Sequence, residues 1–220
     1  MSFLYKLLKI PVFYSLSQIL LAPGSGILLK NQYLRIFEKS RGIVLDVGCG
    51  PALTTPQPDG LIVGADINPH YVEKYTGIGI DTNPQIISDK LQRRNRFGFV
   101  SSADSLPFDD SVFDESRSVG LLHHLYTESA TNVVKEMIRC TRSGGHIIIL
   151  DNIWPHRAIC RPLAWLTRRF DRGKWIRTED ELFDLVNSTY QGRWEKQRFT
   201  YSFTGLEMIL LRIQKSIDEK

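Results

Sequence analysis

The sequence is poor in cysteine and has no long uninterrupted apolar run. Its 220 residues contain three cysteines, which stand far apart at Cys49, Cys140 and Cys160. This number and spacing exclude a disulfide framework and a Cys-x-x-Cys metal site, so we expect no bound metal. A reducing, cytoplasmic compartment is the simplest interpretation of such cysteine usage.

The sequence also lacks an extreme charge. The formal net charge is +4, with 42% hydrophobic and 24% charged residues, a composition typical of a globular protein and not of a disordered one. A chain of this length can bury a core unaided. Because the excess of positive charge is modest and no recognised nucleic-acid motif is present, we expect no nucleic-acid partner.

The first thirty residues are apolar but interrupted. Lys6 and Lys9 are the charged residues before Lys30, and Pro11 and Pro23 break the segment. No stretch reaches the roughly 18 to 20 apolar residues that a membrane-spanning helix needs. Three interpretations stay open: a cap over an active site, which we favour, an interfacial membrane helix, and a signal segment. The interfacial helix leaves membrane association as an alternative to a purely cytoplasmic location.

Short apolar runs alternate with helical patterns. Buried strands are predicted at 42–47, 61–67, 96–104, 112–122 and 145–152. A helix is predicted from about Thr127 to Gly144-Gly145, and a second lies within 177–190 before two antiparallel strands at 197–205 and 207–213. The pattern predicts an α/β fold, a Rossmann-like, doubly wound and mostly parallel sheet with an antiparallel C-terminal hairpin.

We divide the chain into three parts of one domain. We expect residues 1–40 to form a helical cap, 41–152 the core that holds a cofactor, and 153–220 a substrate cover with the final helix and strand pair, for the reasons given by the motifs that follow. The connection 51–60 contains Pro51, Pro56 and Pro58, so it leaves room for one turn of helix at most.

The stretch "VLDVGCGP" at 44–51 ends a predicted strand on two glycines, Gly48 and Gly50. Glycines at such a turn let a ligand lie against backbone N–H donors. Asp66 ends the second predicted strand, where a carboxylate can accept both ribose hydroxyls. Each feature alone is better explained as an ordinary turn, but together they favour a nucleoside site.

Two further features follow later strands. Asp104 can accept from the exocyclic amine of a purine, although the acidic loop around it is also consistent with a solvated surface. His123 and His124 stand at the carboxyl edge of the fourth predicted strand, where open α/β sheets bind ligands. One histidine could act as a base, and the alternative is that one packs and the other caps or contacts a ligand.

These stretches occur together in one order: "VLDVGCGP", "GADINPHYV", "SADSLPFDDSVFD", "GLLHHL" and "KEMIRCTRSGGHIIILD". Over about residues 40–152 the sequence resembles the class I S-adenosylmethionine-dependent methyltransferases, in the ubiquinone/menaquinone-type small-molecule branch. The resemblance implies S-adenosyl-L-methionine as the cofactor. One departure is Ala52, which stands where such loops often have a third glycine.

The resemblance also implies roles for individual residues. The loop beneath the methionine part of the cofactor would contain Asp46, Gly48, Cys49 and Gly50. The ribose and adenine would meet Asp66, Ile67, Ala103 and Asp104. The sulfonium and the acceptor would lie near Val119, His123 and His124, the two histidines being the catalytic candidates.

Residues 152–177 are basic and aromatic. They carry seven cations against one acid, Asp171: Arg157, Arg161, Arg168, Arg169, Arg172, Lys174 and Arg177. With the interleaved aromatics, this predicts a cover that binds a small-molecule or amphipathic, lipid-like acceptor with an anionic group, or that makes peripheral membrane contact. The alternative is a solvated face. Neutralising Arg168 and Arg169 is then expected to impair turnover of the acceptor but not cofactor binding.

The predicted function is therefore methyl transfer from S-adenosylmethionine to a small-molecule or lipid-like acceptor. The alternative is a non-catalytic module that keeps the cofactor fold and binds an anionic partner or a membrane surface. A nicotinamide dehydrogenase is disfavoured, because the stretch from Gly48 to Leu53 lacks the last glycine of Gly-x-Gly-x-x-Gly.

Overall fold

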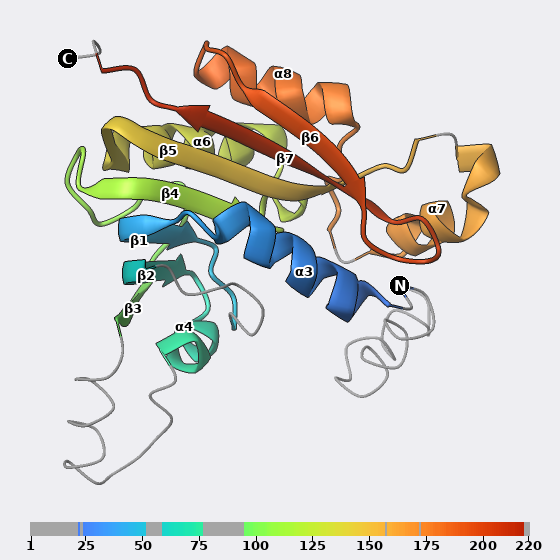
Figure 1. Cartoon of the computed structure of the whole chain (residues 1–220), viewed down its shortest axis with the longest axis horizontal. Coiled ribbons are helices and arrows are strands. Elements are labelled where there is room, and N and C mark those ends of the chain that lie inside the picture. Colours follow the sequence, from blue (N-terminus) through green and yellow to red (C-terminus); the bar gives the residue numbers. More distant parts are fainter. Residues whose placement is uncertain are drawn as a thin grey trace, which may run out of the picture.

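The protein contains one mixed sheet, seen in a computed structural model that describes residues 22, 24–51, 59–76, 95–156, 158–171 and 173–217. The strands are β1 Arg41–Val47, β2 Asp59–Asp66, β3 Arg96–Val100, β4 Phe113–Val119, β5 Thr141–Ile153, β6 Glu195–Thr200 and β7 Glu207–Gln214 (Figure 1). Their order is β3-β2-β1-β4-β5-β7-β6. β1 to β5 run parallel, and β7 pairs antiparallel with both β5 and β6. The predicted fold class is confirmed.

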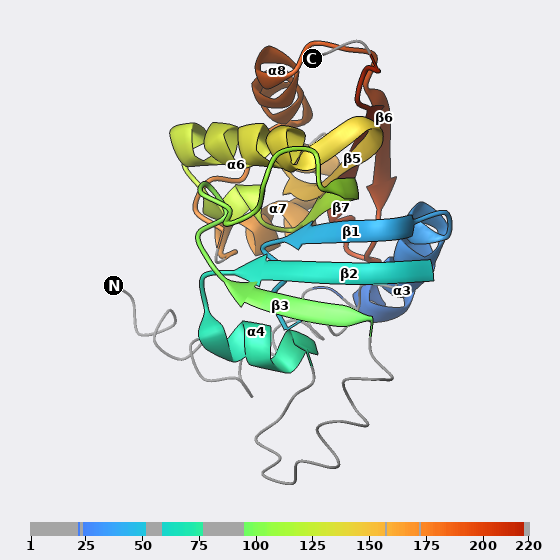
Figure 2. The ribbon, with the colours of Figure 1, turned by 90° about the vertical axis from the view of Figure 1, so that its left-hand side faces the viewer.

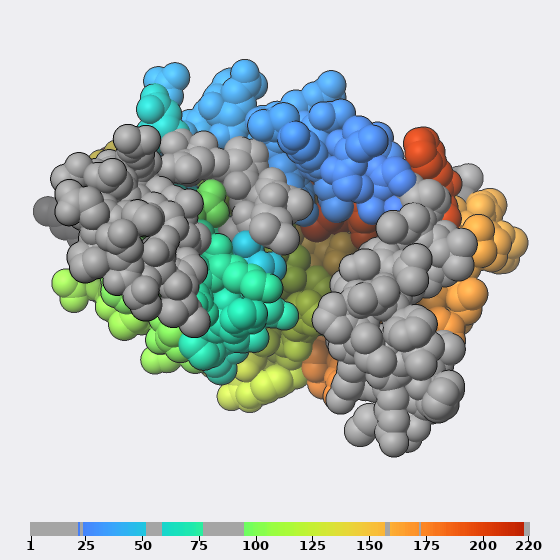
Figure 3. Space-filling view, turned by 90° about the horizontal axis from the view of Figure 1, so that it is seen from below, coloured from blue at the N-terminus to red at the C-terminus, as the bar shows by residue number. Residues whose placement is uncertain are grey.

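Helices cover both faces of this sheet. They are α3 Ser25–Phe37, α4 Pro69–Thr76, α6 Thr127–Cys140, α7 Pro162–Arg169 and α8 Glu179–Thr189, with short 3-10 turns η1 Leu122–His124 and η2 Ala158–Cys160. α6 and α8 lie on one face, and α4 lies on the other (Figure 2). Figure 3 shows the molecule from below the view of Figure 1, with α4 near the centre and α3 along the upper side.

The two faces are built from alternate residues of the same strands. Leu45 and Ile149 belong to the cluster that contains the buried side of α6 and α8. Ile148 and Leu150 instead pack with α3. Because side chains alternate across a strand, a strand covered by helices on both faces has apolar residues at successive positions. This explains why the central strands appear in the sequence as unbroken apolar runs.

The junction between α6 and β5 differs from the prediction. The helix was expected to reach Gly144-Gly145, but it ends at Cys140 and β5 begins at once with Thr141. The hydroxyl of Thr141 donates to the carbonyl oxygen of Met137 at 2.6 Å and accepts from Ser116 Oγ at 2.7 Å, and these bonds hold the end of the helix inside the core. The two glycines lie within β5, beside a shift in the register of its pairing with β4.

Other boundaries are shorter than predicted. β3 ends at Val100, not 104, β4 spans Phe113–Val119, not 112–122, and β6 ends at Thr200, not 205. Most of the connection 51–60 and most of the apolar N-terminus, 1–21, lie outside the described residues. Among the described residues, no helix combines the length and the apolar character needed to cross a membrane.

Glu207, the first residue of β7, joins the C-terminal hairpin to the segment that carries α7. Its buried carboxylate accepts from Arg198 Nη2 at 2.5 Å and from the backbone N–H of His156 at 2.8 Å, and it pairs with Arg161. Its carbonyl oxygen accepts from Arg168 Nη2 at 2.8 Å. Burial alone would raise the pKa of Glu207, but the hydrogen bonds from Arg198 and His156 and the two cations outweigh it and hold the pKa below its ordinary value.

We predict that Glu207→Gln lowers the free energy of unfolding at pH 7 by about 1–3 kcal/mol, because Arg198 and Arg161 lose their anion. A carboxylate with a lowered folded-state pKa stabilises the fold above its unfolded pKa and loses that contribution as the pH falls through the folded value. The gap between wild type and variant should therefore shrink below about pH 4.5, the ordinary value. Urea unfolding across pH 3 to 8 measures it. Glu195→Gln, an exposed glutamate of β6, is the matched control, and an equal loss there would contradict the assignment.

Candidate active site

A tight glycine turn follows β1. The backbone N–H groups of Gly48 and Cys49 donate to the carbonyl oxygen of Ala65 at 2.8 and 3.2 Å, which fastens the turn to the end of β2. Gly48 and Gly50 have φ values of 67° and 54°, a region that disfavours side chains. A Cβ on Gly48 would collide with Leu121, whereas no described residue other than the chain neighbours lies within 4 Å of a Cβ placed on Gly50. The turn is therefore packed on one side and open at Gly50.

Asp66 ties this turn to the loop after β2. Its Oδ2 accepts from the backbone N–H of Gly50 at 3.0 Å, and its Oδ1 accepts from that of Asn68 at 2.8 Å. Each carboxylate oxygen has a second lone pair, so a ribose hydroxyl could still donate to it. Ile67, the next residue, exposes its apolar side chain to solvent. The structure thus brings together Gly50, Asp66 and Ile67 at one edge of the sheet.

Two of the residues assigned to the cofactor loop lie beneath it. Asp46 is buried, and its Oδ2 accepts from Tyr75 Oη at 3.1 Å and from Arg117 Nη2 at 3.5 Å. Cys49 is buried too, and burial, together with the charge of Asp46, raises the pKa of its thiol well above the ordinary value. Both side chains support the turn from below in the structure, and their contact with the cofactor stays a prediction.

The predicted adenine residues lie beyond β3. Asp104 is exposed, and it accepts from Ser102 Oγ at 2.5 Å and from Ser129 Oγ, in the first turn of α6, at 3.4 Å. Ala103 is half-buried against the core cluster. These hydrogen bonds fix the direction of a carboxylate that still faces solvent, which suits an acceptor for an amine.

The acceptor side is built on η1, immediately after β4. Val119, at the end of β4, is half-buried against the cluster beneath α3. His123 is buried and His124 is exposed, with their ring centroids 4.0 Å apart. Asp151, near the end of β5, accepts from the backbone N–H of His123 at 3.2 Å and meets its Nδ1 at 2.5 Å.

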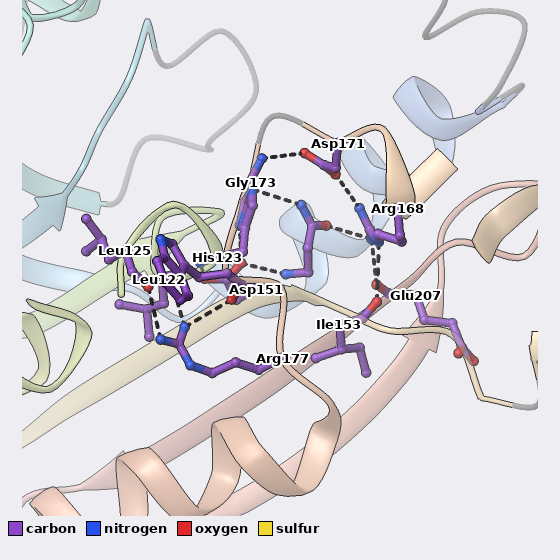
Figure 4. A network of polar contacts seen from close by, with 12 residues as sticks. Leu122, His123, Leu125, Asp151, Ile153, Arg168, Asp171, Gly173, Arg177 and Glu207 are labelled. Carbon is purple, nitrogen blue, oxygen red and sulfur yellow. Dashed lines mark hydrogen bonds and ion pairs between the residues drawn. The ribbon is translucent and has the colours of Figure 1, made fainter. Parts of the chain in front are cut away.

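A chain of hydrogen bonds fixes the tautomer of His123 (Figure 4). Arg168 has only donors, and its Nη2 donates to Asn152 Oδ1 at 2.9 Å. Asn152 therefore turns its amide nitrogen toward His123 Nε2, at 3.4 Å, where it donates. The ring proton is left on Nδ1, facing Asp151. Both ring nitrogens of His123 are thus committed to groups of the protein.

Residues 173–177 cover this histidine. The backbone N–H of Trp175 donates to the carbonyl oxygen of His123 at 3.0 Å, and a side chain at Gly173 would collide with the His123 ring. Arg177 donates to the carbonyl oxygens of Leu122 and Leu125 at 2.9 and 3.0 Å. The indole of Trp175 remains 49% exposed, so an aromatic surface adjoins the histidine loop.

The basic segment 152–177 is less cationic on its surface than its sequence suggests. Arg168 and Arg177 are buried in internal networks, and Arg161 pairs with Glu207. The expectation that Arg168 faces an acceptor was wrong, because its guanidinium joins α7 to β5, β7 and Tyr201. Arg169 and Lys174 are exposed, while Arg157 and Arg172 lie outside the described residues.

Asp151 is the site residue that sequence reasoning missed. Its signal was present, since it stands near the end of the strongly apolar run 147–150 in β5, the parallel neighbour of β4. Carboxyl ends of adjacent parallel strands meet at one edge of a sheet. An acid there and a histidine just after β4 are therefore expected to meet.

The residues at this edge fit S-adenosylmethionine. A nucleoside with an amino acid tail requires approachable backbone, an acceptor for its hydroxyls, an apolar surface and an acceptor for its amine. Among the described residues these are offered by the turn at Gly50 and by Asp66, Ile67 and Asp104. They lie at the carboxyl ends of β1 to β3, where the order of the strands reverses beside β4.

Comparison with known proteins agrees with this geometry. Residues 45–149 match the family described as "Methyltransferase domain". The chain is 28% identical over 117 residues to the tRNA (carboxymethyluridine(34)-5-O)-methyltransferase of Arabidopsis thaliana, a region covering 52% of this chain and 24% of that protein. It is 29% identical over 120 residues to the ajmaline N-methyltransferase of Rauvolfia serpentina, covering 53% of this chain and 38% of that protein. The matched regions are thus less than half of either relative.

A solved structure shares the fold over almost the whole chain. The crystal structure of a SAM-dependent methyltransferase from Aquifex aeolicus aligns with a TM-score of 0.57 at 16% identity, covering 95% of this chain and 96% of that one. Residues 45–149 therefore match a methyltransferase domain, and the chain has the fold of a SAM-dependent methyltransferase, which agrees with S-adenosyl-L-methionine as the expected cofactor.

Proposed function

We propose that this protein transfers the methyl group of S-adenosylmethionine to an amphipathic, lipid-like acceptor, in the manner of the ubiquinone/menaquinone-type branch. The observation that carries the proposal is Trp175, whose backbone N–H donates to the carbonyl oxygen of His123 while the residue is 49% exposed. An apolar acceptor with one polar, methylatable end fits beside such a surface. The aromatic part would pack, and the polar end would face η1.

The cofactor supplies an activated methyl group on a sulfonium, so the protein has to align the acceptor and exclude water. Asp66 and Asp104 would hold the nucleoside, and the open backbone at Gly50 would receive the tail. The cover of Gly173 to Arg177 closes one side of the histidine loop. An acceptor held between this cover and the cofactor would be oriented by packing, with little need for further charged contacts.

His124 is the better candidate for a base when the acceptor loses a proton. A base must come within hydrogen-bond reach of the proton that it removes. Both ring nitrogens of His123 are engaged by Asp151 and Asn152, whereas His124 is exposed on the same turn. We therefore assign His123 to positioning and His124 to proton acceptance.

A nucleic-acid acceptor is the second candidate, favoured by the 28% identity to a tRNA methyltransferase. The charge distribution argues for the lipid-like acceptor. Arg161, Arg168 and Arg177 are consumed by internal contacts, so the described part of segment 152–177 offers solvent mainly Arg169 and Lys174. Phosphate backbones are usually met by several free cations.

The acceptor classes can be separated with S-adenosylmethionine that carries a tritiated methyl group. The full chain is incubated with a total lipid extract or with unfractionated tRNA, and tritium is counted in each. We expect transfer to the lipid fraction. Transfer to tRNA alone would overturn the acceptor class. Cofactor binding without transfer to either would favour the non-catalytic module.

We predict that Asp66→Ala weakens S-adenosylmethionine binding by about 1–3 kcal/mol, because the ribose loses a charged acceptor and the glycine turn loses its tie. Asp104→Ala should cost less, since one amine contact replaces two hydroxyl contacts. Asp59→Ala, at the opposite end of β2, is the matched control. Calorimetry on variants with unchanged thermal unfolding decides, and the reverse order for Asp66 and Asp104 would mean that the adenine is misplaced.

We predict that His124→Gln lowers the turnover number about 100-fold or more on a proton-losing acceptor, with cofactor affinity retained, because general bases contribute about that much. His123→Gln should instead lower the unfolding temperature, since Asp151 would lose its buried partner. Steady-state rates with calorimetry and thermal melts separate the two. A His124 variant with full turnover would remove the proposed base.

A further inference from the structure

The outer surface of α7 is apolar where a surface helix should be polar. Ala164, Thr167 and Arg168 face the protein and are buried. On the opposite side, Leu163 and Leu166 are 55% and 42% exposed. Surface helices ordinarily bury one apolar stripe and expose polar residues on the other face. Here the polar guanidinium points inward and the leucines point to solvent.

The exposed apolar residues form one stripe. Positions 163, 166 and 170 are three and four residues apart, so they lie on one side of a helix. Phe170, the residue after α7, is 52% exposed, and Ile159, in the separate short turn η2 that contacts α7, is almost fully exposed. The outer stripe comprises Ile159, Leu163, Leu166 and Phe170. Contiguous exposed apolar surface of this kind marks an interaction site.

The described charges around the outer stripe are positive. Arg169 follows Leu166 on the adjoining side of α7, and Lys174 lies just beyond the helix; both are exposed, and neither forms an ion pair with a described residue. Asp171, the acid of this segment, is bound to Arg168 at 3.0 Å and to the backbone N–H of Gly173 at 3.0 Å. The negative charge is therefore neutralised internally, while two cations remain available beside the apolar side chains.

The stripe also stands at the edge of the protein. α7 lies at one end of the molecule, to the right in both Figure 1 and Figure 3. Arg161, just before α7, donates to the carbonyl oxygen of Gly205 in the β6–β7 turn, which carries the largely exposed Phe203. An interfacial membrane contact typically combines leucine, phenylalanine and isoleucine with flanking arginine and lysine. The edge of the protein at α7 has this composition.

We propose that the outer stripe of α7, with Arg169 and Lys174, docks this protein on the surface of a bilayer that contains anionic lipid. The apolar side chains would enter the headgroup boundary, and the two cations would meet lipid phosphates and carboxylates. Arg168 holds the helix from the other side, so α7 is presented as a fixed ridge. The proposal does not depend on which acceptor is methylated, and it deepens the proposed function by giving a lipid-like acceptor a place of origin.

The test is co-sedimentation of the full chain with sucrose-loaded phosphatidylcholine vesicles that contain about one fifth phosphatidylserine. Wild-type protein should sediment with them, less with pure phosphatidylcholine vesicles, and less at about 0.5 M salt than at about 0.05 M. Leu163→Ser with Leu166→Ser should weaken binding about tenfold or more, at both salt concentrations. Arg169→Gln with Lys174→Gln should weaken it about tenfold at low salt, with a smaller loss at high salt.

Matched controls are available elsewhere on the surface. Ile27→Ser replaces an apolar residue of α3 that is 72% exposed, and Arg193→Gln with Lys135→Gln removes two exposed cations. These variants should bind vesicles as wild type does. Every variant should keep the wild-type affinity for S-adenosylmethionine and the wild-type unfolding temperature, because none of the substituted side chains holds the fold or the cofactor.

The outcomes separate docking from catalysis. The docking surface would be overturned if wild-type protein failed to sediment with anionic vesicles, or if both α7 variants bound them as wild type does. This holds even if methyl transfer to detergent-dispersed lipid persists. If the α7 variants lose vesicle binding and no lipid is methylated, docking is upheld and the proposed acceptor is overturned. Equal losses in the controls would show that binding is unspecific, and would also overturn the proposal.

Discussion

The contact between Asp151 and His123 is the constraint on which the acceptor side of this protein depends. One carboxylate, near the end of β5, takes both the backbone N–H and the ring of a residue that follows β4. It therefore fixes the path of η1 and the orientation of the imidazole together. The carbonyl oxygen of His123 in turn receives the N–H of Trp175, so the cover after α7 is positioned by the same residue. The location of His124 follows from this chain of contacts.

Several charged side chains are buried in the interior. Arg117 is fully buried in the sheet, 3.5 Å from Asp46 and above the ring of Phe37 at 4.6 Å from its centroid. Arg168 is also buried, and its guanidinium donates to the carbonyl oxygen of Glu207. Burying such groups costs desolvation that the ion pair often only just repays, and their more reliable effect is on geometry. Each guanidinium can satisfy its donors in only a few arrangements of its partners. The positions of the strand ends and of α7 relative to one another are therefore restricted.

The parts of the fold that depend on periodicity could be predicted from the sequence. The apolar runs of β1, β2 and β5 and the stripe of α6 determine the parallel sheet, and turn chemistry then places the glycines and Asp66 at its carboxyl edge. The end of α6 was missed because it depends on the hydroxyl of Thr141 meeting Ser116, a residue on another strand. Local propensity contains no information on that partner.

The predicted role of Arg168 was wrong for a related reason. In the sequence it is one of seven cations in a segment with a single acid, and a count of charges treats them as equivalent. Its position on α7 places it beside Ala164 and Thr167, on the buried side of the helix. There it donates hydrogen bonds to backbone carbonyl oxygens and to Asn152. The pairing of His123 with Asp151 could have been predicted in part, because the ends of adjacent strands indicate it once the strand order is known. The sequence shows which residue types are present, but it does not show which of them are neighbours in space.

The two sides of α7 connect these observations. Its inner side, through Arg168 and Asn152, reaches the histidine loop, while its outer side is the exposed apolar stripe. One helix, about 10 Å across, therefore separates the predicted acceptor site from the proposed membrane contact. An acceptor that is itself a lipid would have a short lateral path between them. A hydrophilic acceptor would gain nothing from that proximity. The arrangement of α7 thus favours a lipid-like acceptor on grounds independent of the cofactor site.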